Sequence, residues 1–141
     1  MVSFIPKKVS GKYRTIADGA ITNGKPVIIN ADGTVSQVSA SAPVTTENYI
    51  GIASGGTYAD TAEATIDIIG TINKDQTSLT AGQTYFVQAD GTLATSADSI
   101  SVIAGTAISS TELLIATTKS ATPQVGLFGG GTNSSGVMTE I

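Results

Sequence analysis

The sequence contains one pattern twice, and this internal repeat limits what the chain can fold into more than any other feature. Residues 21–36 read ITNGKPVIINADGTVS and residues 79–94 read LTAGQTYFVQADGTLA. A shorter match follows each copy, YIGIAS at 49–54 and IAGTAIS at 103–109, so the repeat spans 21–54 and 79–109. Six positions of the longer match are identical, namely Thr22/Thr80, Gly24/Gly82, Ala31/Ala89, Asp32/Asp90, Gly33/Gly91 and Thr34/Thr92. Two unrelated hairpins of similar composition are the alternative, but identities in the same order favour two related β-units within one body.

The identical residues are those that a tight turn requires. An Asp-Gly pair supplies the positive φ of a hairpin turn, and the Thr that follows it returns the chain to the β conformation. A Gly three residues into each copy permits a sharp turn before a strand. We therefore expect structural and not catalytic roles for Gly24, Asp32, Gly33, Gly82, Asp90 and Gly91.

Turn residues recur at short intervals along the whole chain and separate it into short apolar runs. These runs predict strands at 13–16, 26–30, 34–38, 49–53, 64–72, 84–88, 100–108 and 112–116, with a loop at 39–48. Many short strands at close spacing predict an all-β fold with a β-sandwich or barrel-like body. Asp60 and Glu63 have the spacing of a helix capping box, so a short helix at 60–65 is the alternative for that segment.

Composition divides the chain into a basic N-terminal arm at 1–16, a β-body at 17–118 and a Gly-rich C-terminal tail at 119–141. Four of the seven basic residues lie in the arm, although the whole chain has a net charge of −4. The arm is either solvated or docks on an acidic protein surface, and the tail is either disordered or ordered on a neighbouring subunit. Candidate partner-binding residues are Phe4, Ile5, Lys7, Lys8, Lys12, Arg14, Leu127, Phe128, Val137, Met138 and Ile141.

The residues that most catalysis requires are missing. The chain has no His and no Cys, which removes the usual general base, the commonest metal ligand and the Cys nucleophile. We therefore expect no enzyme and neither a cofactor nor a metal, although a weak calcium site at 73–77 (NKDQT) is an alternative. Asp67 lies in an apolar strand that places Ile66, Ile68, Gly70 and Ile72 on one face; it could be partly buried, but a solvent-facing position is favoured.

Partners are also limited by the sequence. The basic residues are not interleaved with aromatic ones, and the acidic body would repel phosphate, so nucleic acid is not expected. No apolar run approaches the ~18 residues of a membrane span, and the N-terminus does not resemble a signal peptide. We expect a soluble product that is not exported or that assembles with itself.

The two copies of the repeat resemble small structural proteins of tailed bacteriophages. ITNGKPVIINADGTV leading into IGIA is similar to head decoration (cement) proteins, and LTAGQTYFVQADGTL followed by AGTAISSTELLI is similar to tail-fibre modules. The resemblance covers most of 21–115 and implies an all-β virion subunit, often trimeric, that binds other coat components and catalyses nothing. Because the chain is short and has apolar termini, we favour a cement protein on the capsid surface, with the major capsid protein and further copies of itself as partners. The alternative is a tail-fibre or baseplate module that attaches to host glycans.

Overall fold

The chain folds into β-strands alone wherever its structure is described. The computed structural model describes residues 8, 9 and 11–116, and within them it contains eleven strands and no helix. None of these residues therefore forms a helix able to cross a membrane. The strands are β1 (Lys8–Val9), β2 (Lys12–Ile16), β3 (Pro26–Ile29), β4 (Val35–Gln37), β5 (Tyr49–Ser54), β6 (Glu63–Ile68), β7 (Ile72–Asn73), β8 (Thr84–Val87), β9 (Leu93–Ala94), β10 (Ile103–Ala107) and β11 (Leu113–Ile115). The all-β prediction is confirmed, and the helix considered at 60–65 is wrong because residues 60–62 form a turn and the second half of the segment belongs to β6.

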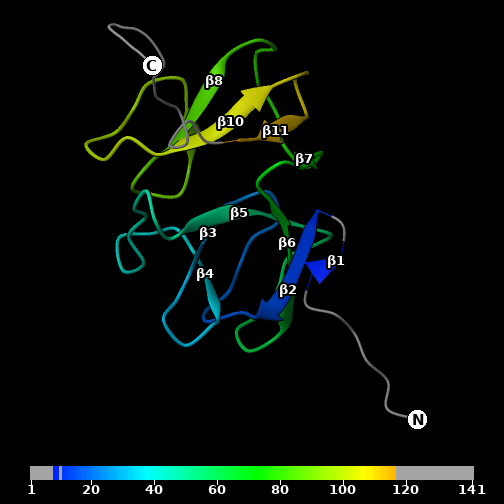
Figure 1. Ribbon diagram of the computed structural model, residues 1–141, viewed down its shortest axis with the longest axis vertical. Helices are drawn as coiled ribbons and strands as arrows, with labels where there is room; N and C mark the ends of the chain where they lie inside the picture. Colours follow the sequence, from blue (N-terminus) through cyan, green and yellow to red (C-terminus); the bar gives the residue numbers. More distant parts are fainter. Residues whose placement is uncertain (1–7, 10, 117–141) are drawn as a thin grey trace, which may run out of the picture.

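The strands form two sheets with the same internal arrangement (Figure 1). One sheet has the order β1-β2-β6-β5-β3-β4 and the other has the order β7-β11-β10-β8-β9, with every named pair antiparallel. When β1 is set aside, the two sheets have the same strand order. The corresponding strands are β2 and β7, β6 and β11, β5 and β10, β3 and β8, and β4 and β9. We call residues 11–70 the first unit and residues 71–116 the second unit.

The repetition extends to single backbone atoms. A Cβ added to Gly51 in β5 would lie 2.0 Å from the carbonyl oxygen of Asp67, and one added to Gly105 in β10 would lie 2.1 Å from that of Leu114. Each of these glycines also adjoins a register shift against its neighbouring strand, β3 or β8. Asp67 in the first unit therefore corresponds to Leu114 in the second.

Strand register extends this correspondence to β2 and β7. Lys12 pairs with Asp67 in the first unit, and Ile72 pairs with Leu114 in the second. Lys12 thus corresponds to Ile72, and the residue after each, Tyr13 and Asn73, corresponds as well.

The single strand predicted at 64–72 is wrong after Ile68. The chain turns at Ile69 and Gly70, where Gly70 has a φ of 98°, and it continues as β7 in the other sheet. Gly70 and Ile72 therefore do not continue the strand of Ile66 and Ile68, because this turn is where the chain passes from the first unit to the second.

The N-terminal boundary also differs from the expected arm at 1–16. Strand β2 pairs along β6 from Lys12 to Ile16, and β1 pairs with β2 as an additional edge strand. The β-body thus includes residues that composition alone assigned to the arm.

Each unit has an inner face and an outer face. In the first unit the inner-face side chains pack together, and a parallel bridge between Ala17 and Val35 draws the two edges of the sheet toward each other. We define the inner face as the side of the strands that carries this core, and the outer face as the opposite side of the same strands. In the second unit, a residue is assigned to the inner or the outer face according to the first-unit residue to which it corresponds. The buried residues of this first core are Ala17, Ile21, Val27, Val35, Ala53, Ala64 and Ile66.

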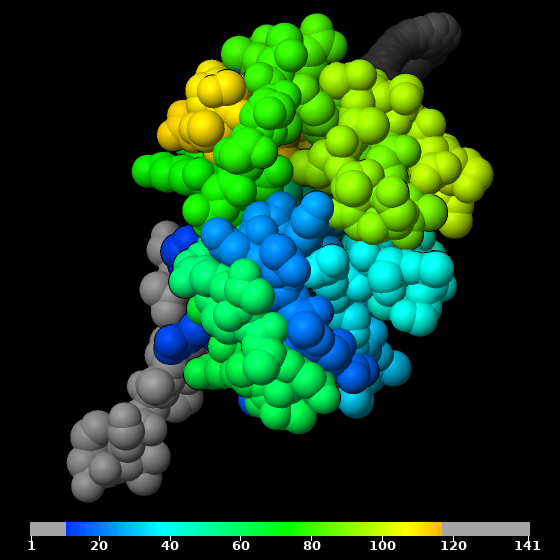
Figure 2. All heavy atoms as spheres, turned by 180° about the vertical axis from the view of Figure 1, so that it is seen from behind, coloured from blue at the N-terminus to red at the C-terminus, as the bar shows by residue number. Residues whose placement is uncertain are grey.

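The second and larger core is shared between the units. The outer face of the first unit supplies Ile28, Tyr49 and Ile52, and residues of its adjoining loop add to them. The inner face of the second unit supplies the rest of this core. Its buried members are Ile28, Val38, Val44, Tyr49, Ile52, Tyr85, Val87, Val102, Ala104, Ala107, Leu113 and Ile115. The units therefore stack head to tail, the outer face of one against the inner face of the other, and Figure 2 shows them in direct contact from behind.

Candidate functional site

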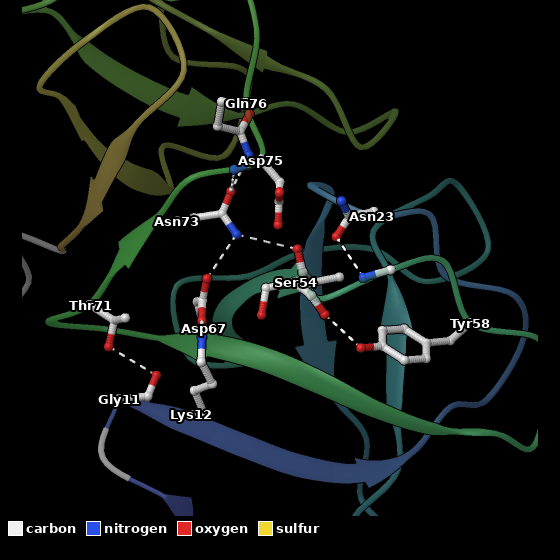
Figure 3. A network of polar contacts seen from close by, with 12 residues as sticks. Gly11, Lys12, Asn23, Ser54, Tyr58, Asp67, Thr71, Asn73, Asp75 and Gln76 are labelled. Carbon is white, nitrogen blue, oxygen red and sulfur yellow. Dashed lines mark hydrogen bonds and ion pairs between the residues drawn. The ribbon is translucent and has the colours of Figure 1, made fainter.

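The junction between the units contains a buried polar network centred on Asn73 (Figure 3). Asn73 has no solvent exposure. Its Nδ2 donates to Oδ2 of Asp67 at 3.0 Å and to the carbonyl oxygen of Ala53 at 3.3 Å. Its Oδ1 accepts hydrogen bonds from the backbone N–H of Asp75 at 3.1 Å and from Nε2 of Gln76 at 3.0 Å. One side chain of the second unit thus joins two strands of the first to its own connecting loop.

Asp67 is the charged member of this network, and the predicted solvent-facing position is wrong. The residue is 2% exposed because the second unit covers the outer face of the first. Its carboxylate forms an ion pair with Nζ of Lys12, whose side chain is 46% exposed, and it accepts the hydrogen bond from Asn73. A buried carboxylate needs such partners, since an unpaired buried charge is costly. The network therefore fastens the two units to each other.

A second polar contact crosses the same junction. The hydroxyl of Tyr49 donates to the carbonyl oxygen of Ala104 at 3.2 Å. Burial raises the pKa of the Tyr49 hydroxyl above its ordinary value, so this group remains a neutral donor.

An apolar hollow of about 390 Å³ opens on the first unit, and it adjoins the shared core at Tyr49. It is formed where the inner-face side chains of β2, β3, β5 and β6 reach the end of the sheet. Its lining residues are Tyr13, Ile29, Tyr49, Ile50, Ile68 and Ile69. Ile69 is 44% exposed at the rim, in the turn that leads to the second unit. Apolar side chains gathered in a concave surface are typical of a binding site for an apolar group.

The same positions of the second unit are covered. Ile29, Ile50 and Ile68 correspond to Val87, Ala104 and Ile115, which all have no solvent exposure. These three residues lie in the shared core, against the outer face of the first unit. The hollow is therefore the first unit's version of the surface that the second unit uses to receive the first.

The outer face of the second unit is apolar and lies open among the described residues. Leu114 is 37% exposed and Ile72 is 39% exposed, while Phe86, Ile103 and Thr106 are half-buried beside them. Of the corresponding residues in the first unit, Lys12 is half exposed, and the others are buried in the junction, namely Asp67, Ile28, Tyr49 and Ile52. The molecule thus carries two open surfaces, the hollow and this outer face.

The Asp side chains of the two repeated turns accept the same pair of hydrogen bonds. Oδ1 of Asp32 accepts from the backbone N–H of Thr34 at 3.0 Å and from its hydroxyl at 2.7 Å. Oδ1 of Asp90 accepts the same two bonds from Thr92, at 3.0 Å and 2.6 Å. These bonds, first that from the Thr hydroxyl, lower the pKa of each carboxyl below its usual value. Both carboxylates hold turns in place on the surface.

The glycines of the repeat all adopt positive φ. Gly24 and Gly82 have φ of 82° and 88°, and Gly33 and Gly91 have φ of 88° and 87°. The two units thus use glycine for the same backbone conformation at both turns.

The predicted partner-binding residues divide into two sets. Lys12 and Arg14 lie on β2, where Lys12 is used in the junction and Arg14 is half-buried. Lys8 lies on β1, opposite Tyr13. The remaining ones lie outside the described residues: Phe4, Ile5, Lys7, Leu127, Phe128, Val137, Met138 and Ile141.

The hollow and the role of Asn73 in the junction were not expected from the sequence, in which Asn73 was only part of the possible calcium site at 73–77. The signal available in the sequence was that predicted strands carry apolar residues on both faces. A single core would cover only one face of each strand. Among the described residues there is no group of three or more His, Cys, Asp or Glu that could hold a metal ion.

Comparisons with protein-family models, with curated proteins and with solved structures found no match.

Proposed function

We propose that this chain is a non-enzymatic structural subunit of a phage virion, a decoration protein that binds and stabilises neighbouring major capsid subunits on the head. One observation carries the proposal: large apolar side chains remain exposed on a body whose two cores are already filled. Two of these side chains are neighbours, since Ile72 pairs with Leu114 across β7 and β11, and exposed apolar patches are typical of sites that bind other proteins. The exposed residues are Ile16, Ile69, Ile72, Ile100, Ile108 and Leu114. The phage assignment comes from the sequence resemblance.

The non-enzymatic part of the proposal is supported by the structural roles of three carboxylates. Asp67 is a buried carboxylate in the described part of the chain, and Lys12 and Asn73 occupy its oxygens. The carboxylates of Asp32 and Asp90 are occupied in turns. These groups act as structural supports in our proposal and take no part in chemistry.

In the proposed role, the described body is a rigid spacer and the chain ends are the clamps. The N-terminal residues include Phe4, Ile5 and Lys7, and the C-terminal residues include Leu127 and Phe128. We propose that both ends contact the major capsid protein, the basic end through acidic surface. Binding through charge weakens as salt rises, since the Debye length falls from ~10 Å at 0.1 M salt to ~3 Å at 1 M.

The decisive experiment is to add the purified chain to heads that lack it and to count the copies bound by cryo-electron microscopy. We expect many copies at regular positions over the head and a higher temperature of head disruption. A few copies confined to the tail would contradict decoration and would support the tail-fibre alternative, which binding to host glycans would then test.

Deletions of the two ends test the clamp. Removal of 1–7 keeps β1, and removal of 117–141 keeps β11, so both variants should fold as the full chain does. We expect each deletion to reduce occupancy on heads, with Lys25→Ala as a control that removes a basic residue of the body. Undiminished occupancy after both deletions would contradict the clamp, and binding that is insensitive to salt would indicate apolar docking of the N-terminal end.

A further inference from the structure

The contact between the two units uses one surface of each unit. The molecule also carries the surface that corresponds to each of these two. The first unit gives its outer face and the second unit gives its inner face. The corresponding inner face of the first unit is the apolar hollow, and the corresponding outer face of the second unit lies open among the described residues. A contact of the same kind is therefore available between two molecules.

The polar positions of the junction show how closely its two surfaces match. On the outer face of the first unit stand Lys12 and Asp67, and opposite them on the second unit stands Asn73. A charged pair on one side is met by an amide on the other. Asp67 and Asn73 are buried and are hydrogen-bonded to each other, as buried polar groups require.

The corresponding positions on the two open surfaces have all changed together. Ile72 and Leu114 stand where Lys12 and Asp67 stand in the first unit, and Tyr13 in the hollow stands where Asn73 stands in the second. An apolar pair on the outer face is thus matched by an aromatic ring on the inner face. The replacement is concerted across surfaces that do not touch within the molecule.

We propose that a second copy of this chain occupies the hollow, with the outer face of its second unit packed against the first unit of its neighbour. In this contact Leu114 and Ile72 of one copy lie against Tyr13 of the next, in place of the ion pair and amide of the junction. Burial of these side chains supplies the driving force.

The contact is heterologous, because it joins two different surfaces. Each copy offers one surface and receives on the other, so association continues until a ring closes or a filament forms. This inference stands on the internal repeat and does not depend on the proposed function.

Sedimentation velocity of the purified full chain over a wide concentration range tests the inference. We expect assemblies larger than a monomer that grow with concentration. Leu114→Lys on the outer face and Ile69→Lys in the hollow should each abolish them and leave a folded monomer. Ile16→Lys is the matched control, since Ile16 is 45% exposed, close to the 44% of Ile69, but lines neither surface.

Mixing the two interface variants identifies the head-to-tail geometry. Leu114→Lys retains an intact hollow and Ile69→Lys retains an intact outer face, so the mixture should form a one-to-one dimer that neither variant forms alone. Failure of the mixture to associate, while each variant alone has lost assembly, would overturn the heterologous contact.

Two further results would overturn the proposal. One is a wild-type chain that is monomeric at every concentration; if Ile69→Lys then lowers the melting temperature more than Ile16→Lys does, residues of the same molecule fill the hollow. The other is wild-type assembly that neither variant changes, which would place the contact elsewhere. Because no phage particle is present, these results are distinct from any failure of the decoration experiment.

Discussion

Gly33 and Gly91 occupy the same turn of the two units and have the same φ, yet their surroundings differ. A Cβ added to Gly33 meets nothing within 4 Å, whereas one added to Gly91 lies 2.3 Å from the carbonyl oxygen of Val38 in the other unit. The second turn is therefore part of the junction and the first is not. Substitution of Gly33 therefore measures the free-energy cost of the backbone conformation alone. Substitution of Gly91 adds the cost of the contact across the junction.

We expect Gly33→Ala to lower the free energy of unfolding by about 1–2 kcal/mol, the cost of placing a Cβ at positive φ. Gly91→Ala should lower it by about 1–3 kcal/mol more, because the new methyl group overpacks the junction. Urea denaturation of both variants measures the difference. Equal losses of unfolding free energy in the two variants would show that the junction accommodates the methyl group at Gly91 without further cost.

The carboxyl of Asp90 should titrate at a higher pH in Thr92→Val. The substitution removes the hydroxyl donor, which is the largest cause of its lowered pKa, and keeps the backbone N–H. Carboxyl NMR titration measures the change, and Thr34→Val should do the same to Asp32. A pKa of Asp90 that does not move would assign the shift to the backbone bond alone.

The sign of the linked stability change follows from the lowered pKa. A carboxyl with a folded pKa below its unfolded value of about 3.9 stabilises the fold above that pH, and this stabilisation is lost as pH falls through the folded pKa. We therefore expect Thr92→Val to lose less stability between pH 5 and acid pH than the wild-type chain does.

At the scale of elements, β6 and β7 are fastened to each other by Asp67 and Asn73. Asn73→Leu removes a hydrogen bond from the buried carboxylate, which keeps its ion pair with Lys12, and should cost about 1–3 kcal/mol. Asp67→Leu places at this position the residue found in the second unit, and it should cost about 1–3 kcal/mol because a buried amide N–H loses its acceptor.

The double variant should lose less free energy of unfolding than the sum of the losses of the two single variants, by about 0.5–3 kcal/mol. In the double variant neither residue is left without its partner, because both are replaced. Equilibrium unfolding of the wild-type chain and the three variants gives this coupling. Lys74→Ala is the control, because its side chain is exposed and lies outside the Asp67–Asn73 contact, and exposed charges contribute little. Strict additivity would show that the two side chains do not act together.

At the scale of the whole molecule, the shared core prevents the units from unfolding separately. The second unit buries its inner face against the first, and the buried residues include Val87, Ala104 and Ile115. Loss of the first unit would expose this face to water, which is unfavourable in proportion to its apolar area.

We therefore expect a single cooperative unfolding transition for the full chain. Tryptophan is absent, so tyrosine fluorescence and far-ultraviolet circular dichroism are the two probes, and their curves should coincide. Two separate transitions would show that the first core alone is sufficient to keep the first unit folded.

The sequence by itself determined those features that depend on neighbours along the chain. The Asp-Gly-Thr turns, the positive φ at Gly24 and Gly82, and the all-β fold follow from local turn chemistry and composition. The duplication could be read from the same residues, since a turn imposes its requirements on a few consecutive positions.

The tertiary structure alone decided how the two units meet. Asp67 has the sequence surroundings of a solvent-facing strand position, and only the second unit, stacked on that face, makes it buried. The break after Ile68 and the open hollow beside Tyr13 have the same origin. Burial depends on which distant surface covers a residue, and this information is distributed over both units and is not present in any single segment.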